Sequence, residues 1–340
     1  MRHILAHMFI LTTVLAMESR TTTDESRATL GSFSGLSALS WAVPRLYQYP
    51  KFLSDDEIDH LVNYARASKI FEAAEARLEA VRQTGQDESS LPLLTSVYFD
   101  WNAIYNDPIV NAIEQRIAIV TGMPPHKHEE PLNVHRIRTL RRDLAWPQNK
   151  TSCRGKTCPR KVTSIHHDKV QKEHSTATVL VYLNDVSEGG GTIFPCGSIP
   201  PRAPHDGVVS GACSEAFKEG ARWYDGSDTT VKGRPKKLTT PTPVDDELAE
   251  ILWAAHLGCH ATSAKNDMAN SSEARGPADP FVDWKKKPVR TLPVKGTALV
   301  FFHTHPNGAP DPYAWHAGCV PLSNEKWTLQ KFKEMPMQWR

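Results

Sequence analysis

The sequence predicts a mainly β fold with flanking helices, an α+β class arranged as a barrel or jelly roll. Three observations predict it. Runs of β-branched, aromatic and apolar residues, bounded by turn residues, begin after Val134. Helix signals concentrate before residue 121. Proline is more frequent than glycine, 25 residues against 19, which favours long irregular loops over an all-helical body.

Two helices are expected in the first half of the folded region. The segment Ser54 to Glu57 has the form of a capping box and starts the first helix. The second spans Asp107 to Val120, with Pro108 in its first turn. Their apolar faces comprise Ile58, Leu61, Val62 and Ala65 in the first helix, and Ile109, Ile113, Ile117 and Val120 in the second. Between them, Arg82 to Ser90 is polar and turn-rich, which predicts a mobile loop.

Three strands are expected in the second half. Thr178 to Leu183 (TVLVYL) and Thr297 to Phe302 (TALVFF) combine β-branched, aromatic and apolar residues. Trp327 to Phe332 (WTLQKF) alternates in polarity. Glycines follow the first run at Gly189 to Gly191, and Gly296 precedes the second, so each run is bounded by turn signals.

The chain divides into three parts by composition. Residues 1–19 are expected to form a signal peptide or a short signal anchor, and the Ser/Thr/Gly-rich residues 20–42 a flexible stem. Residues 43–340 are expected to form one domain. Two segments without strand periodicity, at about 141–160 and 197–290, are interpreted as insertions into it.

The first residues predict entry into the secretory pathway. Arg2 and His3 precede a mostly apolar run, Ile4 to Ala16, which is too short to span a bilayer but suits the core of a signal peptide. A cytosolic start that is apolar by coincidence is the alternative. Whether the signal is cleaved or retained as a membrane anchor stays open.

Cysteines and glycosylation sites favour the same compartment. Six cysteines can pair completely, and Cys153 and Cys158 are near enough to pair locally. Sequons begin at Asn149 and Asn270, so a glycoprotein is expected. We therefore expect disulfide bonds and a location in the lumen or membrane of the endoplasmic reticulum, with the Golgi as the alternative.

Charge and composition exclude several classes of protein. Lys plus Arg is 40 and Asp plus Glu is 38, so the formal net charge is +2 and no nucleic-acid partner is expected. Hydrophobic residues make up 40% and charged residues 23%, which is ordinary for a globular chain and excludes collagen-like and wholly disordered proteins. The oligomeric state is not predicted.

The segment His166-His-Asp168 carries the first chemical signal. On a strand, residues two apart face the same side, so His166 and Asp168 can present a nitrogen and a carboxylate oxygen to one metal ion. With 15 histidines a chance match is expected, and a surface charge pair is the alternative. His316 would complete a set of two histidines and one carboxylate, typical of non-haem Fe(II) oxygenases. Lys326, ten residues further, would need an anionic partner if it is buried.

Several motifs occur in the order in which one enzyme family carries them. They are Pro44 to Ser54, Asp107 to Ala118, His166 to Asp168, Ala177 to Val186, Gly189 to Pro195, Pro293 to Phe302, His305 to Asp311, and His316 to Trp327. Together they cover most of residues 43–332, and the chain resembles the prolyl 4-hydroxylase family of 2-oxoglutarate/Fe(II)-dependent dioxygenases.

The resemblance implies a fold and a set of site residues. The fold is a double-stranded β-helix (jelly-roll) core buttressed by N-terminal helices. His166, Asp168 and His316 are implied as iron ligands and Lys326 as the anchor of 2-oxoglutarate. Thr178 and Tyr182, which share one face of a strand, are expected to line the co-substrate pocket, or alternatively to be packed core residues. Fe(II), 2-oxoglutarate, O₂ and L-ascorbate are the implied cofactors.

The implied activity is hydroxylation of peptidyl proline to 4-hydroxyproline with release of succinate and CO₂, on a proline-rich polypeptide. One alternative is a related dioxygenase acting on peptidyl lysine or another residue. A second is a catalytically silent lumenal protein that binds proline-rich chains. The histidine pairs His256/His260, His303/His305 and His126/His128 are interpreted as ordinary histidines, because no partner carboxylate accompanies them.

Overall fold

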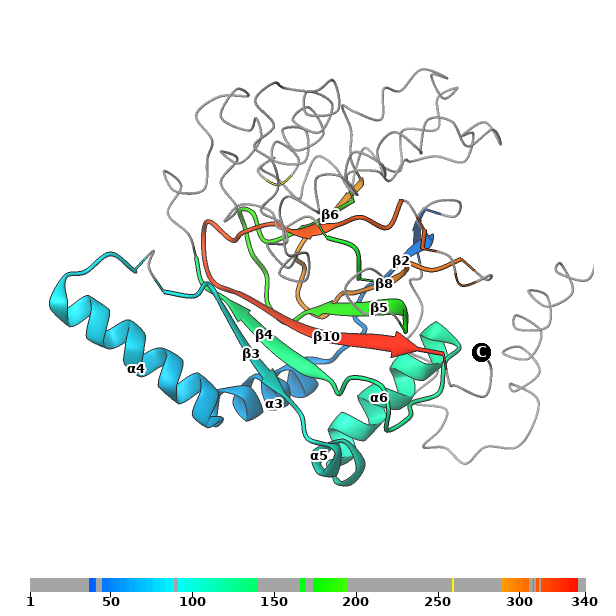
Figure 1. The fold of residues 1–340 in the computed structure, drawn as a ribbon, viewed down its shortest axis with the longest axis horizontal. Helices are drawn as coiled ribbons and strands as arrows, with labels where there is room; N and C mark the ends of the chain where they lie inside the picture. Colours follow the sequence, from blue (N-terminus) through cyan, green and yellow to red (C-terminus); the bar gives the residue numbers. More distant parts are fainter. Residues whose placement is uncertain are drawn as a thin grey trace, which may run out of the picture.

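We analysed a computed structural model of the chain (Figure 1). The structure describes residues 37–40, 45–88, 91–139, 166–168, 174–194, 259, 289–305, 308, 310, 311 and 313–335. The predicted signal segment 1–19, both sequons, the insertion at 141–160 and most of the insertion at 197–290 lie outside them. The proposed division into signal, stem and domain therefore stays a prediction.

Two antiparallel sheets form the body of the fold, which confirms the predicted mainly β class with a jelly-roll core. The larger sheet has the strand order β1-β2-β8-β5-β10-β4-β3, and the smaller sheet has the order β7-β6-β9. The strands of the larger sheet are β1 (Ser37–Ser40), β2 (Arg45–Tyr49), β8 (Ala298–Phe302), β5 (Ser175–Tyr182), β10 (Lys326–Glu334), β4 (Asn133–Ile137) and β3 (Leu94–Tyr98). Those of the smaller sheet are β7 (Val289–Thr291), β6 (Thr192–Phe194) and β9 (Ala317–Gly318).

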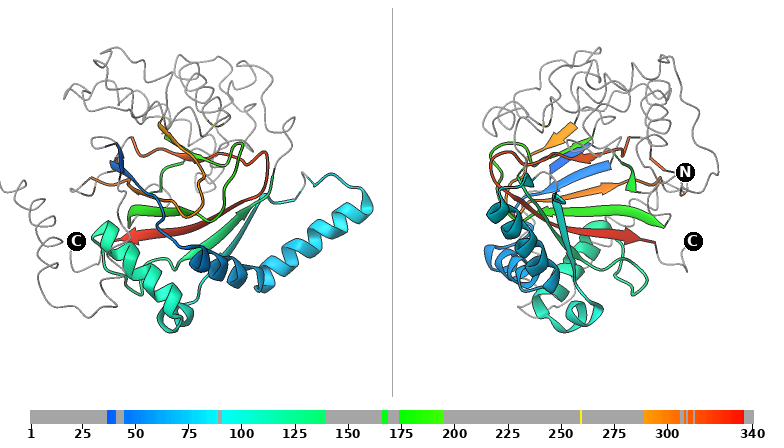
Figure 2. Two further views of the ribbon diagram at one scale, coloured as in Figure 1. Left: turned by 180° about the vertical axis from the view of Figure 1, so that it is seen from behind. Right: turned by 60° about the vertical axis from the view of Figure 1, so that its left-hand side comes forward.

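One face of the larger sheet meets the smaller sheet, and the other meets the helices (Figures 1 and 2). Between the sheets, Phe194 of β6 packs against Phe301 of β8 with ring centroids 5.2 Å apart. The helices are α3 (Asp55–Arg66), α4 (Lys69–Thr84), α5 (Trp101–Asn106) and α6 (Pro108–Thr121). Their apolar faces share one core cluster with the outward-facing residues of the sheet, so the N-terminal helices buttress it as expected. None of the described helices is long and apolar enough to cross a membrane.

The predicted helices α3 and α6 are confirmed, and their end signals explain their bounds. Ser54 and Glu57 form the capping box of α3, each side chain accepting the other's backbone N–H. Asp107 caps α6 by accepting from the N–H groups of Ile109 and Val110. Arg116 of α6 binds Glu57 through both guanidinium nitrogens, at 2.6 and 3.0 Å, and so joins the two helices.

The prediction of a mobile loop over Arg82 to Ser90 is wrong at its start, because α4 continues through Thr84 and ends at Gly85. The helix begins at Ser68, whose side chain caps it. Its sequence is rich in Ala, Glu and Arg, which favour helix intrinsically, but only Phe71 and Leu78 of the helix are buried. Too few apolar residues therefore recur at helical spacing for α4 to be predicted from the sequence.

The three predicted strands are confirmed as β5, β8 and β10, within a few residues at each end. The predicted stem 20–42 contains β1, which pairs antiparallel with β2 at the edge of the larger sheet. The rest of that stem lies outside the described residues. β3 and α5 were not predicted; both are short, and β3 lies at the opposite edge.

Behind β10, on the helix side, four charged residues are fully enclosed. This Lys–Glu cluster consists of Lys331, Lys333, Glu114 and Glu129. Lys331 Nζ lies 2.8 Å from Glu114 Oε1 and 3.1 Å from Glu129 Oε1, while Lys333 Nζ lies 2.8 Å from Glu129 Oε1. The cluster therefore ties β10 to α6 and to the loop after it, and its charges balance.

Replacing Lys331 by methionine is expected to lower the free energy of unfolding by about 3–5 kcal/mol, because Glu114 would be left buried without its cation. Urea unfolding measures the change. The matched control is Lys331→Met combined with Glu114→Leu, which removes both charges and should recover most of the loss. Equal stability of the single variant and the unaltered protein would contradict this reading of the cluster.

Candidate active site

The three predicted ligand residues meet between the two sheets. The backbones of His166 and His316 pair as an antiparallel bridge, with reciprocal N–H···O distances of 2.9 Å. The Nε2 atom of His166 lies 3.4 Å from Asp168 Oδ1, and that of His316 lies 3.7 Å from Asp168 Oδ2. One ligand atom from each residue lies within 4.8 Å of the others. Among the described residues this is the one such group of three.

The carboxylate of Asp168 is fully buried and only half satisfied. Thr178 Oγ1 donates a hydrogen bond of 2.5 Å to Oδ2, whereas Oδ1 has no hydrogen-bond partner among the described residues. Burial raises the pKa of the Asp168 carboxyl, but the electrostatic interactions of the carboxylate with His316 and His166 outweigh it and hold that pKa below its usual value. Asp168 is therefore anionic, with one buried oxygen that accepts no hydrogen bond from the described residues.

His316 is held in the protonation state that a metal ligand needs. Its Nδ1 lies 3.0 Å from the carbonyl oxygen of Ala314, which requires a proton on Nδ1 and leaves Nε2 with a free lone pair. Burial lowers the pKa of His316 to about 4, so the ring is neutral at pH 7. Phe301 packs edge-on against it with centroids 4.7 Å apart, which fixes the ring plane.

His167, between the two ligands, makes its polar contact with another segment of the chain. Its Nε2 lies 2.8 Å from the carbonyl oxygen of Asp311, and its ring packs edge-on against Trp315. The nearby His303 hydrogen-bonds Ser175, and His126 hydrogen-bonds the backbone of Glu334. His167, His303 and His126 thus make structural contacts.

The donor set fits a ferrous ion. Two neutral imidazoles and one carboxylate are the protein ligands of non-haem Fe(II) oxygenases, which leave coordination positions for other ligands. The unpartnered Oδ1 of Asp168 is a buried anionic oxygen, which costs free energy unless a cation pairs with it. His166, Asp168 and His316 could therefore hold the metal.

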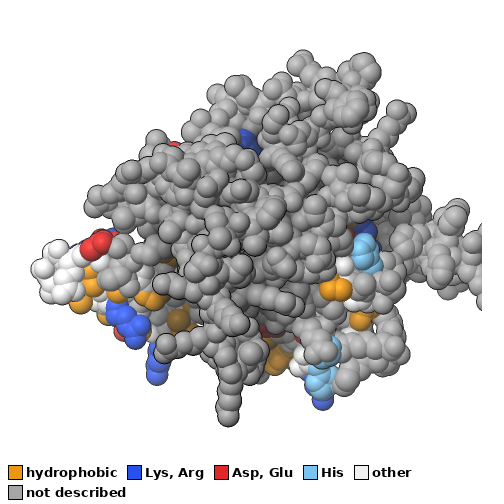
Figure 3. Space-filling view, turned by 45° about the horizontal axis from the view of Figure 1, so that its top comes forward, with side chains coloured by type: hydrophobic (Ala, Val, Ile, Leu, Met, Phe, Trp, Pro, Cys, Tyr) orange, Lys and Arg blue, Asp and Glu red, His pale blue; other side chains and the backbone are white. Residues whose placement is uncertain are grey.

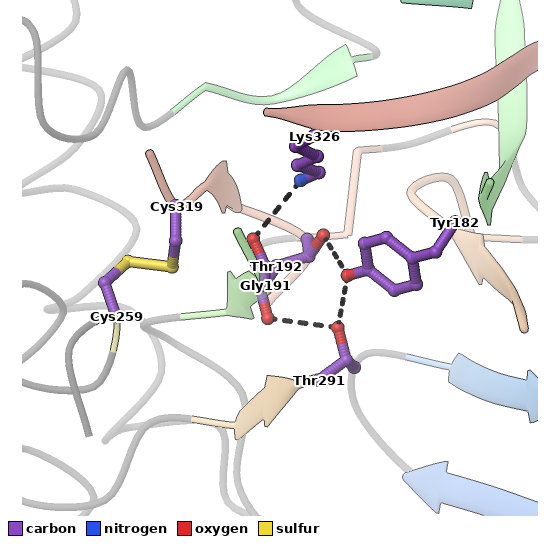
Figure 4. The surroundings of a disulfide bond; sticks show 7 residues. All are labelled: Tyr182, Gly191, Thr192, Cys259, Thr291, Cys319 and Lys326. Carbon is purple, nitrogen blue, oxygen red and sulfur yellow. Dashed lines mark hydrogen bonds between the residues drawn. A yellow bond between two sulfur atoms is a disulfide. The ribbon is translucent and has the colours of Figure 1, made fainter. Parts of the chain in front are cut away.

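Lys326 points from β10 toward Gly191 and Tyr182 (Figure 4). It is 2% exposed, and burial lowers the pKa of its ammonium group to about 7. Its Nζ makes one long hydrogen bond, 3.5 Å to the carbonyl oxygen of Gly191, and lies 5.2 Å from the ring centroid of Tyr182. A buried ammonium group with a single long hydrogen bond is energetically costly. A bound anion, such as a carboxylate, would stabilise it.

Tyr182 joins the two sheets beside Lys326. Its hydroxyl lies 2.8 Å from the hydroxyls of both Thr192 and Thr291, on β6 and β7 (Figure 4). The structure thus brings Tyr182 beside Lys326 and Thr178 against Asp168, and the prediction that both line the co-substrate pocket stays a prediction. Close packing requires glycine at position 191, where a Cβ would lie 2.3 Å from the carbonyl oxygen of Thr291.

A disulfide bond between Cys259 and Cys319 lies next to this pocket (Figure 4). Cys319 follows β9, and Cys259 lies within the segment 197–290 that the sequence analysis interprets as an insertion, so the bond joins this segment to the smaller sheet. Gly318 is adjacent, and a Cβ there would lie 3.8 Å from Lys326 Nζ. The other four cysteines lie outside the described residues.

Thr192 and Thr291 were missed as site residues. Thr192 follows three glycines, a turn signal that indicates a strand start but no contact. Thr291 lies on a three-residue strand at the end of the long insertion, where the sequence carries no periodic signal. Their meeting at Tyr182 depends on the packing of one sheet on the other.

The described surface carries charges of both signs. In Figure 3, acidic and basic side chains lie together at the left-hand end, where α4 is located. Arg82 and Glu88 are one such pair, with Nε and Oε1 3.0 Å apart. This mixture matches the near balance of charge in the whole sequence.

Known proteins similar in sequence are prolyl 4-hydroxylases. The chain is 25% identical to probable prolyl 4-hydroxylase 4 of Arabidopsis thaliana over 334 residues, which cover 97% of this chain and 80% of that protein. It is 22% identical to prolyl 4-hydroxylase 2 of the same plant, with 96% and 78% covered. A search of protein-family models finds no match.

Two prolyl hydroxylases are among the solved structures with which the chain aligns. The viral collagen prolyl hydroxylase from Paramecium bursaria Chlorella virus-1 aligns with a TM-score of 0.41 and 13% identity, covering 86% of this chain and 96% of that chain. A Pseudomonas putida prolyl-4-hydroxylase aligns with a TM-score of 0.31 and 11% identity, covering 87% and 95%. On the sequence relatives and the ordered motifs, the chain is related to the prolyl 4-hydroxylases, a family of 2-oxoglutarate- and Fe(II)-dependent dioxygenases.

Proposed function

We propose that the protein hydroxylates peptidyl proline to 4-hydroxyproline, using Fe(II), 2-oxoglutarate and O₂ and releasing succinate and CO₂. The observation that carries the proposal is the convergence of His166, Asp168 and His316 around an unpartnered carboxylate oxygen, in a chain related to prolyl 4-hydroxylases. The buried Lys326 on the same face supplies the charge that a dicarboxylate needs.

His166, Asp168 and His316 would hold the iron, and Lys326 would bind the distal carboxylate of 2-oxoglutarate. When bound, the ion and the co-substrate together supply the oxidising chemistry that inserts an oxygen atom from O₂ into a prolyl C–H bond. L-Ascorbate is the reductant that keeps the iron ferrous in this family. The residues of the chain position these groups and exclude water from them.

Described residues of the site can perform both the positioning and the exclusion of water. Thr178 fixes the orientation of the Asp168 carboxylate through a 2.5 Å hydrogen bond, and Ala314 fixes the tautomer of His316 through its carbonyl oxygen. Phe194 and Phe301 pack against His316 and limit the access of water to the ligand side of that ring.

The relatives and an exposed aromatic side chain support this substrate class. Both Arabidopsis proteins are named for action on proline. Proline-rich chains adopt the polyproline II conformation and dock on exposed aromatic side chains at low entropic cost. Tyr98, on the edge strand β3, is 49% exposed, whereas the neighbouring Phe99 is buried and stacks on Tyr64. Tyr98 is therefore a candidate contact for the peptide.

We place the enzyme in the endoplasmic reticulum, in the lumen or at the membrane. The disulfide between Cys259 and Cys319 supports an oxidising compartment, because such bonds are rare in the cytosol. The apolar run at Ile4 to Ala16 is of the length expected for a signal core.

The function is tested by succinate release in the presence of Fe(II), 2-oxoglutarate and ascorbate, with and without a proline-rich peptide. We expect peptide-dependent succinate release and the mass of one added oxygen atom on a proline. A peptide with alanine in place of proline is the matched control. Tight peptide binding without turnover would favour the silent binder, and oxygen on a lysine would favour the alternative dioxygenase.

A further inference from the structure

The strand register places two side chains symmetrically about Lys326. Thr328, two residues along β10, lies opposite Tyr182 of β5 on one side and opposite His135 of β4 on the other. Residues directly opposite one another share a face of the sheet, so His135, Thr328 and Tyr182 form one row across the face that carries Lys326. His135 and Tyr182 are therefore the two diagonal neighbours of Lys326, a spacing that long and aromatic side chains bridge.

The two diagonal neighbours differ in what their polar atoms can do. The hydroxyl of Tyr182 is already engaged by Thr192 and Thr291, each at 2.8 Å. The ring of His135 is half-buried, and within the described ranges no hydrogen bond to either of its nitrogens is found. A neutral imidazole has one N–H donor. His135 can therefore donate a hydrogen bond to a ligand, whereas the hydroxyl of Tyr182 is already hydrogen-bonded within the protein.

His135 and Lys326 also interact electrostatically. Burial and, to a smaller extent, the positive charge of Lys326 together lower the pKa of His135 to about 4. The ring is therefore neutral at pH 7, beside an ammonium group whose nearest hydrogen-bond acceptor is 3.5 Å away. Among the described residues no anion is hydrogen-bonded to either of these donors, and a carboxylate with two oxygens can accept from both.

We propose that His135 is a second residue that binds the distal carboxylate of 2-oxoglutarate, donating an N–H to one oxygen while Lys326 binds the other. This inference rests on the function proposed above. It assigns to β4 a direct contact with the co-substrate, in addition to the contact that β10 provides.

The test is calorimetric binding to the full chain loaded with Zn(II), which prevents turnover. Two ligands are compared: 2-oxoglutarate, and 2-oxopentanoate, which has the same carbon chain without the distal carboxylate. His135→Phe keeps a ring but removes both nitrogens, His135→Asn keeps an N–H donor, and His128→Phe, at an exposed histidine, is the matched control.

We expect His135→Phe to raise the Kd for 2-oxoglutarate about tenfold or more and to change the Kd for 2-oxopentanoate less than about twofold. His135→Asn should recover part of the loss, and His128→Phe should change neither value. An unchanged Kd in His135→Phe, or equal weakening of both ligands, would overturn the inference alone. Failure of the unaltered protein to bind 2-oxoglutarate would overturn the proposed function and this inference with it.

Discussion

Replacing Asp168 by alanine is expected to abolish metal binding and hydroxylation together. Asp168 supplies the only carboxylate of the three-residue group, and its unpartnered Oδ1 has no substitute among the described residues. Loss of an outer-shell partner typically costs 10–100-fold in metal affinity, so loss of this ligand should cost more than about a hundredfold. Bound metal is measured by elemental analysis after dialysis, and turnover by succinate release.

A graded control separates loss of the ligand from loss of its orientation. Thr178→Val removes the 2.5 Å hydrogen bond to Asp168 but keeps the carboxylate, so metal affinity should fall only about 10–100-fold. His316→Ala should match Asp168→Ala, because it also removes a ligand atom. If either ligand variant retained metal and still consumed 2-oxoglutarate, the assignment of these residues would be wrong.

Replacing Lys326 by methionine is expected to weaken 2-oxoglutarate binding about a hundredfold, because the distal carboxylate would lose its charge partner in a buried pocket. Metal binding should stay unchanged, which distinguishes this variant from those of the metal ligands. Lys295→Met is the matched control: that lysine forms a solvent-accessible ion pair with Asp55, at 2.7 Å. A Kd for 2-oxoglutarate unaffected by Lys326→Met would exclude Lys326 as the anchor.

The pH dependence of 2-oxoglutarate binding should also depend on Lys326. Burial lowers the pKa of Lys326 to about 7, so above that pH the free ammonium loses its proton and must regain one when the carboxylate binds. The Kd for 2-oxoglutarate should therefore rise with pH above about 7, by up to about tenfold per pH unit, and level off below it. Calorimetry from pH 6.5 to 9 in buffers of different ionisation enthalpy measures the proton uptake. In Lys326→Met both the slope and the uptake should disappear.

The same lowered pKa bears on the stability of the protein without co-substrate. An unfolded lysine keeps its ordinary pKa of 10.5, so between about pH 7 and 10.5 the unfolded chain binds more protons at Lys326 than the folded chain. The contribution of Lys326 to the free energy of unfolding therefore rises with pH between about pH 7 and 10.5. Bound 2-oxoglutarate should reduce this rise, because its carboxylate favours the charged lysine.

Local patterns in the sequence determined much of the fold. The capping box at Ser54, the Asp107-Pro108 start and the β-branched runs of β5 and β8 each depend on neighbours within a few residues, so their elements could be predicted. The spacing of His166 and Asp168 likewise placed both side chains on one side of the chain. The helix α4 was not predicted, because its residues favour helix by intrinsic propensity and not by an apolar residue at every helical turn.

The tertiary structure decided which of these elements meet. The backbone pairing of His166 with His316, the contact of Thr192 and Thr291 with Tyr182, and the position of His135 beside Lys326 all join residues far apart in the chain. A period of two tells which face a side chain takes but not which strand lies beside it or in what register. Chemical identity at the site was thus readable from the chain itself, whereas its neighbours depended on how two sheets pack.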